Sequence, residues 1–124
     1  MTLRQLWWLC AWGLVTFVIY LSLAPQTIDL GRIEGVKAGH FTAYAVLMFW
    51  FSQLIQPARS RCALAIALAA MGVTLEYIQD LVGRDFAYLD MRDNAFGVLA
   101  GWAAASTPLG RALQWLERMA RANQ

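Results

Sequence analysis

The chain has 124 residues, of which 60% are hydrophobic and only 15% are charged, and its formal net charge is +2. A soluble domain of this length cannot bury so much apolar surface. The small charge, without a basic patch among aromatic residues, argues against nucleic acid as a partner. Neither cysteine belongs to a Cys-x-x-Cys motif that would indicate a metal or redox site. The composition predicts a single all-α membrane domain over residues 1–124.

Residues 6–24 form a run of nineteen residues without a charge. As a helix this run would span roughly 28 Å, close to the thickness of a bilayer's hydrocarbon core. The alternative is a cleaved signal peptide, because Ser22-Leu23-Ala24 resembles a cleavage site. The run is longer than the usual apolar region of about 7–15 residues in such peptides. We therefore expect a retained membrane helix that ends at Pro25.

Three further runs predict three more membrane helices, which makes a four-helix transmembrane bundle. They cover residues 38–56, 62–82 and 94–110. A tight basic turn, Pro57–Arg61, separates the second helix from the third. Residues 111–124 are expected to form a short amphipathic tail on the membrane surface, with Leu113, Leu116 and Met119 on one side.

The distribution of charge predicts the orientation of this bundle. With the N-terminus inside, the inner segments hold six of the ten Lys and Arg residues and the outer segments hold four. The turn at Arg59 and Arg61 is purely basic, whereas the outer connections mix signs. Positive charge favours the cytoplasmic side. The pattern therefore predicts a multi-pass protein of the bacterial inner membrane with both termini in the cytoplasm.

Polar residues gather at the predicted outer ends of three helices. They are Lys37, His40 and Tyr44 on the second helix, Glu76 and Gln79 on the third, Arg84 in the connection, and Asp90 and Asn94 at the start of the fourth. Residues three or four apart share a helix face. A carboxylate within an apolar helix is costly, by roughly 2.5 kcal/mol or more at the bilayer centre. These faces therefore indicate an outer polar pocket. Gly97 and Gly101 instead indicate close helix packing.

The order and spacing of these residues resemble the signature of the VanZ-like family. The resemblance rests on Lys37-x-x-His40-x-x-x-Tyr44, Glu76-x-x-Gln79, Arg84 and Asp90-x-x-x-Asn94-x-x-Gly97, and it covers residues 37–101. It implies a small bacterial membrane protein, related to one linked to low-level teicoplanin resistance, without implying a reaction. Members often carry a small hydroxyl residue where this chain has Ala87.

Three functions are compatible with the constellation. The first is recognition of an anionic lipid headgroup or a lipid-linked cell-envelope precursor, with Lys37 and Arg84 holding phosphate and the remaining polar groups orienting them. The second is an enzyme on a lipid-linked substrate, with His40 as general acid or base and Glu76 as its partner. The third is a structural subunit, in which a buried pair of Glu76 with Arg84 or Lys37 fixes the bundle.

No cofactor is indicated by the sequence. A metal bound by His40, Glu76 and Asp90 has suitable donor atoms. However, no His-Glu-x-x-His spacing supports it, so no metal site is predicted.

Overall fold

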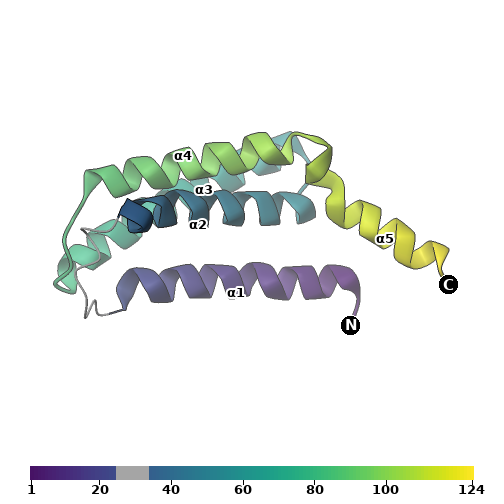
Figure 1. Cartoon of the computed structure of the whole chain (residues 1–124), viewed down its shortest axis with the longest axis horizontal. Coiled ribbons are helices and arrows are strands. Elements are labelled where there is room, and N and C mark those ends of the chain that lie inside the picture. Colours follow the sequence, from purple (N-terminus) through teal and green to yellow (C-terminus); the bar gives the residue numbers. More distant parts are fainter. Residues whose placement is uncertain (25–33) are drawn as a thin grey trace.

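The computed structural model describes residues 1–24 and 34–124, with side chains along the second helix described from Gly39 onward. All regular elements in these residues are helices, as the sequence predicts (Figure 1). They are α1 (Leu3–Leu23), α2 (Glu34–Leu54), α3 (Ala58–Leu81), α4 (Tyr88–Ala105), the 3₁₀ helix η2 (Pro108–Arg111) and α5 (Ala112–Ala122).

The four long helices alternate in direction, so that both chain termini lie at the same end of the bundle (Figure 1). We call this the basic end, because Arg4, Arg59, Arg61, Arg111 and Arg118 lie on the helices that meet there. The other end is called the acidic end. It carries Glu76, Asp80, Asp85, Asp90 and Asp93. The two ends of the bundle therefore differ in charge.

The most extensive helix contact is between α2 and α4. Two glycines of α4 make this close approach possible. A Cβ atom at Gly97 would overlap the carbonyl oxygen of Phe41, and one at Gly101 would overlap that of Ala45. Each glycine thus lets the backbone of α4 rest directly against α2.

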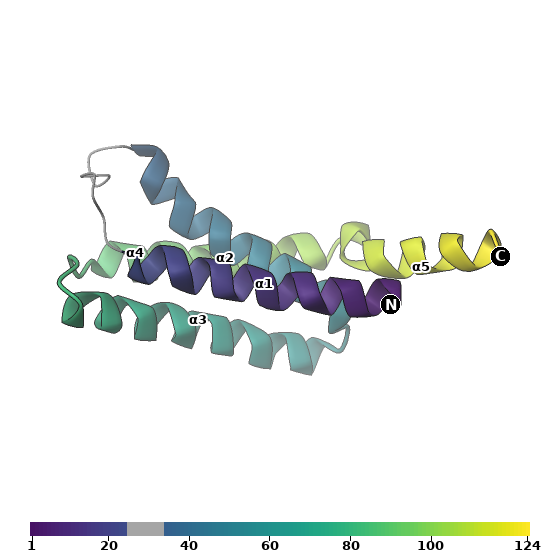
Figure 2. The same cartoon turned by 90° about the horizontal axis from the view of Figure 1, so that it is seen from below.

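Helix α1 lies against α2 and α3 (Figure 2), and near the basic end its aromatic side chains pack on those of α2. The rings of Trp7 and Trp50 stack with centroids 4.2 Å apart, and Trp50 Nε1 donates to the carbonyl oxygen of Trp7 at 3.0 Å. Trp8 and Trp12 both meet the ring of Phe51 edge-on. Edge-on and offset-stacked pairs are the favoured aromatic geometries. The rest of α1 is largely exposed.

The helices extend further into charged sequence than the predicted runs of residues 6–24, 38–56, 62–82 and 94–110. A charge near a helix end can reach water or a partner, so it does not terminate the helix. Arg59 and Arg61, predicted to lie in a turn, belong to the first turn of α3. The C-terminal end of α4 differs in the opposite sense. It lies at Ala105, before the predicted residue 110, because Pro108 cannot continue an α-helix.

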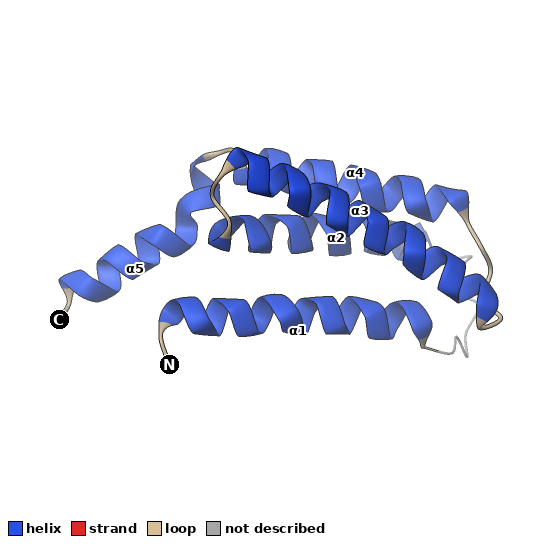
Figure 3. Cartoon of the chain, turned by 180° about the vertical axis from the view of Figure 1, so that it is seen from behind, coloured by secondary structure: helices blue, strands red, loops and turns tan. Residues whose placement is uncertain are grey.

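Arg61 joins the ends of two helices at the basic end. It is only 8% exposed. Its guanidinium donates to the carbonyl oxygens of Ser52 at 2.6 Å, Ile55 at 2.8 Å and Ala105 at 3.2 Å. The last carbonyls of a helix lack partners within the helix. One side chain therefore provides donors to the carbonyl oxygens at the ends of both α2 and α4. These two ends lie near the start of α3 and beside α5 (Figure 3).

Two of the described helices, α1 and α3, are long and apolar enough to cross a membrane. Their most apolar stretches are only 11% and 33% buried within the protein, respectively. Helices α2 and α4 do not meet the same criterion, since α4, for example, carries Asp90, Arg92 and Asp93 within its 18 residues. The four-span arrangement thus remains a prediction.

Candidate functional site

Glu76 serves as the cap of a neighbouring helix. Helix α4 begins after Ala87, whose methyl group cannot accept a hydrogen bond as the usual capping residues do. The Glu76 side chain, 1% exposed on α3, accepts the Ala87 N–H through Oε1 at 2.7 Å. The carboxylate also lies near the positive end of the helix dipole. Glu76 therefore joins the end of α3 to the start of α4.

His40 connects α2 to α4 through both of its ring nitrogens. Nδ1 lies 3.2 Å from Asn94 Oδ1, and Nε2 lies 3.5 Å from Asp90 Oδ2. Because both nitrogens face oxygen atoms, the protonated imidazolium can donate to both, whereas a neutral ring can donate to only one. The side chains of His40 and Asp90 are 24% and 27% exposed, so this pair is accessible from outside the bundle.

Beneath this pair, Tyr44 and Asn94 pack against a glycine. Both side chains are buried, at 2% and 3% exposure. A Cβ atom at Gly72 would lie 3.0 Å from Asn94 Nδ2 and 3.4 Å from Tyr44 Cε1. Gly72 thus makes the room that these two residues occupy. The sequence analysis missed Gly72, whose only signal is a small residue one turn before Glu76.

Gln79 and Arg84 turn toward α1. Gln79 Nε2 donates to the carbonyl oxygen of Ser22 at 2.8 Å. Arg84 Nη1 donates to the same oxygen and to those of Leu21, at 3.1 Å, and Ala24, at 3.3 Å. These are the last carbonyls of α1 and its cap, which have no partners within the helix. Both predicted ligand-binding residues therefore hold the end of α1.

Four predicted site residues at the acidic end are called the polar cluster: His40 with its partners Asp90 and Asn94, and Glu76, which caps the same helix, α4. Arg84 lies beside it, close enough for its charge to act on Glu76. Lys37 lies on the first turns of α2, at the same end, but its side chain is outside the described residues. Side-chain contacts thus join α2 to α4 at this end, and Glu76 joins α3 to the start of α4.

The part of the chain that the structure describes contains no group of three or more His, Cys, Asp or Glu side chains arranged to hold a metal ion. One carboxylate oxygen of Glu76 accepts a hydrogen bond from the backbone N–H of Ala87. Cys10 and Cys62 are exposed and form no disulfide. What the cluster offers chemically is an accessible imidazole and carboxylate above a buried carboxylate.

Comparisons of the chain with protein-family models, with curated proteins and with solved structures found no match.

Proposed function

We propose that the chain is a four-span integral membrane protein of the bacterial inner membrane. In this proposal both termini are cytoplasmic, and the polar cluster recognises the headgroup of a lipid-linked cell-envelope precursor at the outer leaflet. The observation that carries the proposal is the convergence of polar side chains from three helices at one end of an apolar bundle. Ionisable groups at such positions usually mark a functional site.

The exposure of apolar side chains on α1 and α3 supports a location of the chain in a membrane. The core helix of a soluble protein is mostly buried, but α1 and α3 leave most of their apolar stretches exposed. A signal sequence cannot account for α3, which begins at residue 58. Large apolar side chains exposed on these helices include Leu9, Trp12, Phe17 and Tyr20 on α1 and Ile66, Val73 and Tyr77 on α3. Exposed apolar surface of this extent is typical of a membrane-facing protein.

Helices α2 and α4 complete the bundle in this proposal. The 21 residues of α2 span about 31 Å, and the 18 residues of α4 about 27 Å, close to the hydrocarbon thickness. The charges of α4 fall within its first two turns, where side chains reach the interface. The Arg residues at the basic end support a cytoplasmic location for that end, because positive charge favours the cytoplasmic side.

The exposed face of the polar cluster suits a headgroup that carries hydroxyl or amine groups. The Asp90 carboxylate can accept hydrogen bonds from such groups, and His40 can donate to an oxygen of the ligand. Arg84 and Lys37, at the same end, supply positive charge for phosphate. The resemblance to the VanZ-like family adds an envelope context and a link to glycopeptide tolerance.

Binding of an isolated lipid-linked cell-wall precursor to the purified chain in nanodiscs tests this proposal. We expect His40→Gln with Asp90→Asn to weaken binding at least tenfold, as the loss of about 1.4 kcal/mol or more would do. The same variant should lower teicoplanin tolerance in cells that express the chain. A matched control, Arg92→Gln with Asp93→Asn, removes a different ion pair at the same end. Unchanged precursor binding by the first variant would refute recognition by the cluster.

Topology is tested separately, by labelling single cysteines in a chain from which Cys10 and Cys62 have been removed. A membrane-impermeant reagent applied from outside should label a cysteine at Phe86, at the acidic end. It should miss a cysteine at Ser60, at the basic end. Strong labelling at Ser60 would overturn the proposed orientation without bearing on the binding test.

A second candidate function is catalysis on the same class of lipid. The observation that favours it is the His40–Asp90 pair, since a carboxylate that orients an accessible imidazole is a common arrangement for general acid–base chemistry. His40→Ala would then bind the precursor and stop its turnover. If variants of the cluster change neither binding nor turnover, the third option holds, and the cluster only fixes the order of the helices.

A further inference from the structure

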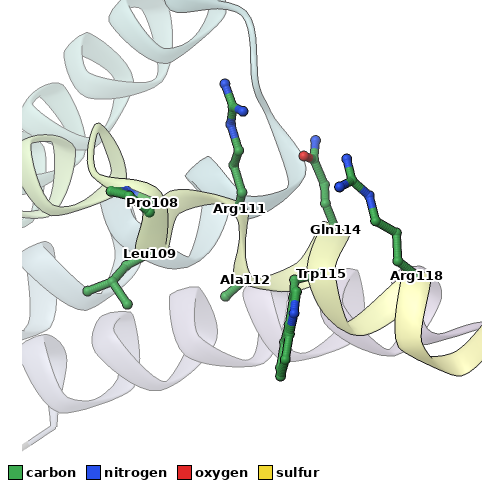
Figure 4. A pocket seen from close by; sticks show the side chains of 7 residues that line it. All are labelled: Pro108, Leu109, Arg111, Ala112, Gln114, Trp115 and Arg118. Carbon is green, nitrogen blue, oxygen red and sulfur yellow. The ribbon is translucent and has the colours of Figure 1, made fainter.

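An open pocket of about 480 Å³ lies at the basic end, between η2 and the start of α5 (Figure 4). Arg111 and Arg118 extend to one side of the helix, whereas Leu109 and Trp115 extend to the other. Guanidinium groups and large apolar side chains thus line one pocket. This pocket is remote from the polar cluster, which lies at the acidic end.

Helix α5 is held in a fixed position relative to the bundle. Leu113 is fully buried, and its backbone N–H donates to Gln53 Oε1 at 3.3 Å. The opposite amide atom of Gln53, Nε2, donates to the carbonyl oxygen of Leu109 at 3.0 Å. The exposed apolar side chains of this segment, Leu109, Trp115 and Met119, are therefore presented on an ordered helix. They form what we call the apolar stripe.

The charge beside the apolar stripe is positive and uncompensated. Among the described residues, no carboxylate lies within salt-bridge distance of Arg111 or Arg118. The acidic residue of α5, Glu117, instead faces Arg4 at 3.9 Å. The guanidinium groups of Arg111 and Arg118 therefore give the pocket a positive charge that an anion would balance.

We propose that α5 lies in the inner-leaflet interface and that Arg111 and Arg118 bind the phosphate of an anionic phospholipid. Trp115 and Leu109 then enter the boundary between headgroups and acyl chains. Trp favours this depth, and Arg extends from it to the headgroups. The inference rests on the proposed membrane orientation, which puts the basic end at the cytoplasmic leaflet. An acidic soluble ligand would match the guanidinium groups but would leave the apolar stripe exposed to water.

The experiment compares two lipids with identical acyl chains, phosphatidylglycerol and phosphatidylcholine. Each is titrated onto the full chain in neutral detergent, and bound lipid is counted by native mass spectrometry. The wild type should prefer phosphatidylglycerol. Removing two Arg residues near an anionic headgroup, at about 1 kcal/mol each, should weaken phosphatidylglycerol binding about thirtyfold. Arg111→Gln with Arg118→Gln should therefore lose the preference, while Arg111→Lys with Arg118→Lys should keep most of it.

A control of equal charge separates the pocket from a general effect of net charge. Arg59→Gln with Arg92→Gln removes two exposed positive charges elsewhere and should keep the preference. If this control loses the preference equally, or if the wild type has none, the assignment to the pocket is overturned. Glycerol phosphate at matched concentration should not displace the lipid, and displacement would show that a soluble anion suffices.

Failure of this inference can be told apart from failure of the proposed function. The His40→Gln, Asp90→Asn variant should prefer phosphatidylglycerol as the wild type does. If that variant loses the preference and the α5 variant keeps it, the anionic lipid binds at the acidic end and the inference falls. Extraction of the expressed chain from membranes with alkaline carbonate checks insertion independently. A chain released by carbonate would overturn both proposals, whatever its lipid preference.

Discussion

Replacing Arg61 with Met tests whether the end of the bundle depends on one buried guanidinium. The change keeps the long side chain but removes every donor. Three hydrogen bonds to backbone oxygens are then lost: the carbonyl oxygens of Ile55 and Ala105 lose their Arg61 donor, and that of Ser52 keeps only Gln56 Nε2. At about 1 kcal/mol net for each bond, the variant should be destabilised by about 3 kcal/mol. The free energy of unfolding can be measured in mixed micelles with sodium dodecyl sulfate, followed by Trp fluorescence.

Arg59→Met is the matched control for this measurement. Arg59 precedes Arg61 by two residues on the same helix, carries the same charge and is exposed. Its replacement should change the free energy of unfolding by less than about 0.5 kcal/mol, as is usual for surface substitutions. If both variants lose the same stability, or if Arg61→Met unfolds like the wild type, the carbonyls do not depend on this side chain and the reasoning is refuted.

Two further predictions concern the acidic half of α4. Gly97→Leu should destabilise the protein by about 1–3 kcal/mol or more, because the new side chain must displace the backbone of α2. Leu99→Ala, at a 56% exposed position of the same helix, is its control in the same unfolding assay. Equal losses of stability in the two variants would contradict the close contact between α4 and α2. Glu76→Ala should speed amide hydrogen exchange at Ala87 about tenfold or more, since a hydrogen bond to a charged group contributes about 1.5–3 kcal/mol. The exposed Asp80→Ala should leave that exchange unchanged, and slow exchange at Ala87 in both variants would show that Glu76 is not the acceptor that protects it.

The existence and direction of the helices were predictable, whereas their ends were not. Uncharged runs located α1 to α4 because burial in an apolar layer selects against charge over a full helix length. The same criterion excluded Arg59 and Arg61 from α3 and Asp90 from α4, although a helix tolerates charges in its terminal turns. Composition alone therefore set the N-terminal boundaries too far inside the helices and the C-terminal boundary of α4 too far out.

The members of the polar cluster were predictable, whereas most of their partners were not. Helical spacing predicted that His40, Glu76 and Asp90 face one another; the structure pairs His40 with Asp90 and has Glu76 bind the Ala87 N–H at the start of α4. The sequence suggested His40, or in the structural alternative a cation, as the partner of Glu76; the hydrogen bond that Glu76 accepts from the Ala87 N–H was not predicted. The hydrogen bonds of Arg84 Nη1 to carbonyl oxygens of α1 were not predicted either. Hydrogen bonds to backbone atoms depend on how the helices pack, and no side-chain pattern in the sequence records them.

The attachment of the end of α1 has a consequence for how the chain is assembled. The carbonyl oxygen of Ser22 receives its donors from Gln79 and Arg84, which follow it by 57 and 62 residues. During synthesis, α1 emerges long before either donor exists, so its final carbonyls must first be solvated by water or lipid headgroups. This end of α1 can therefore take up its final contacts only after α3 and Arg84 have been made and turned back. The aromatic contacts of α1 with α2, at the basic end, need not wait for them.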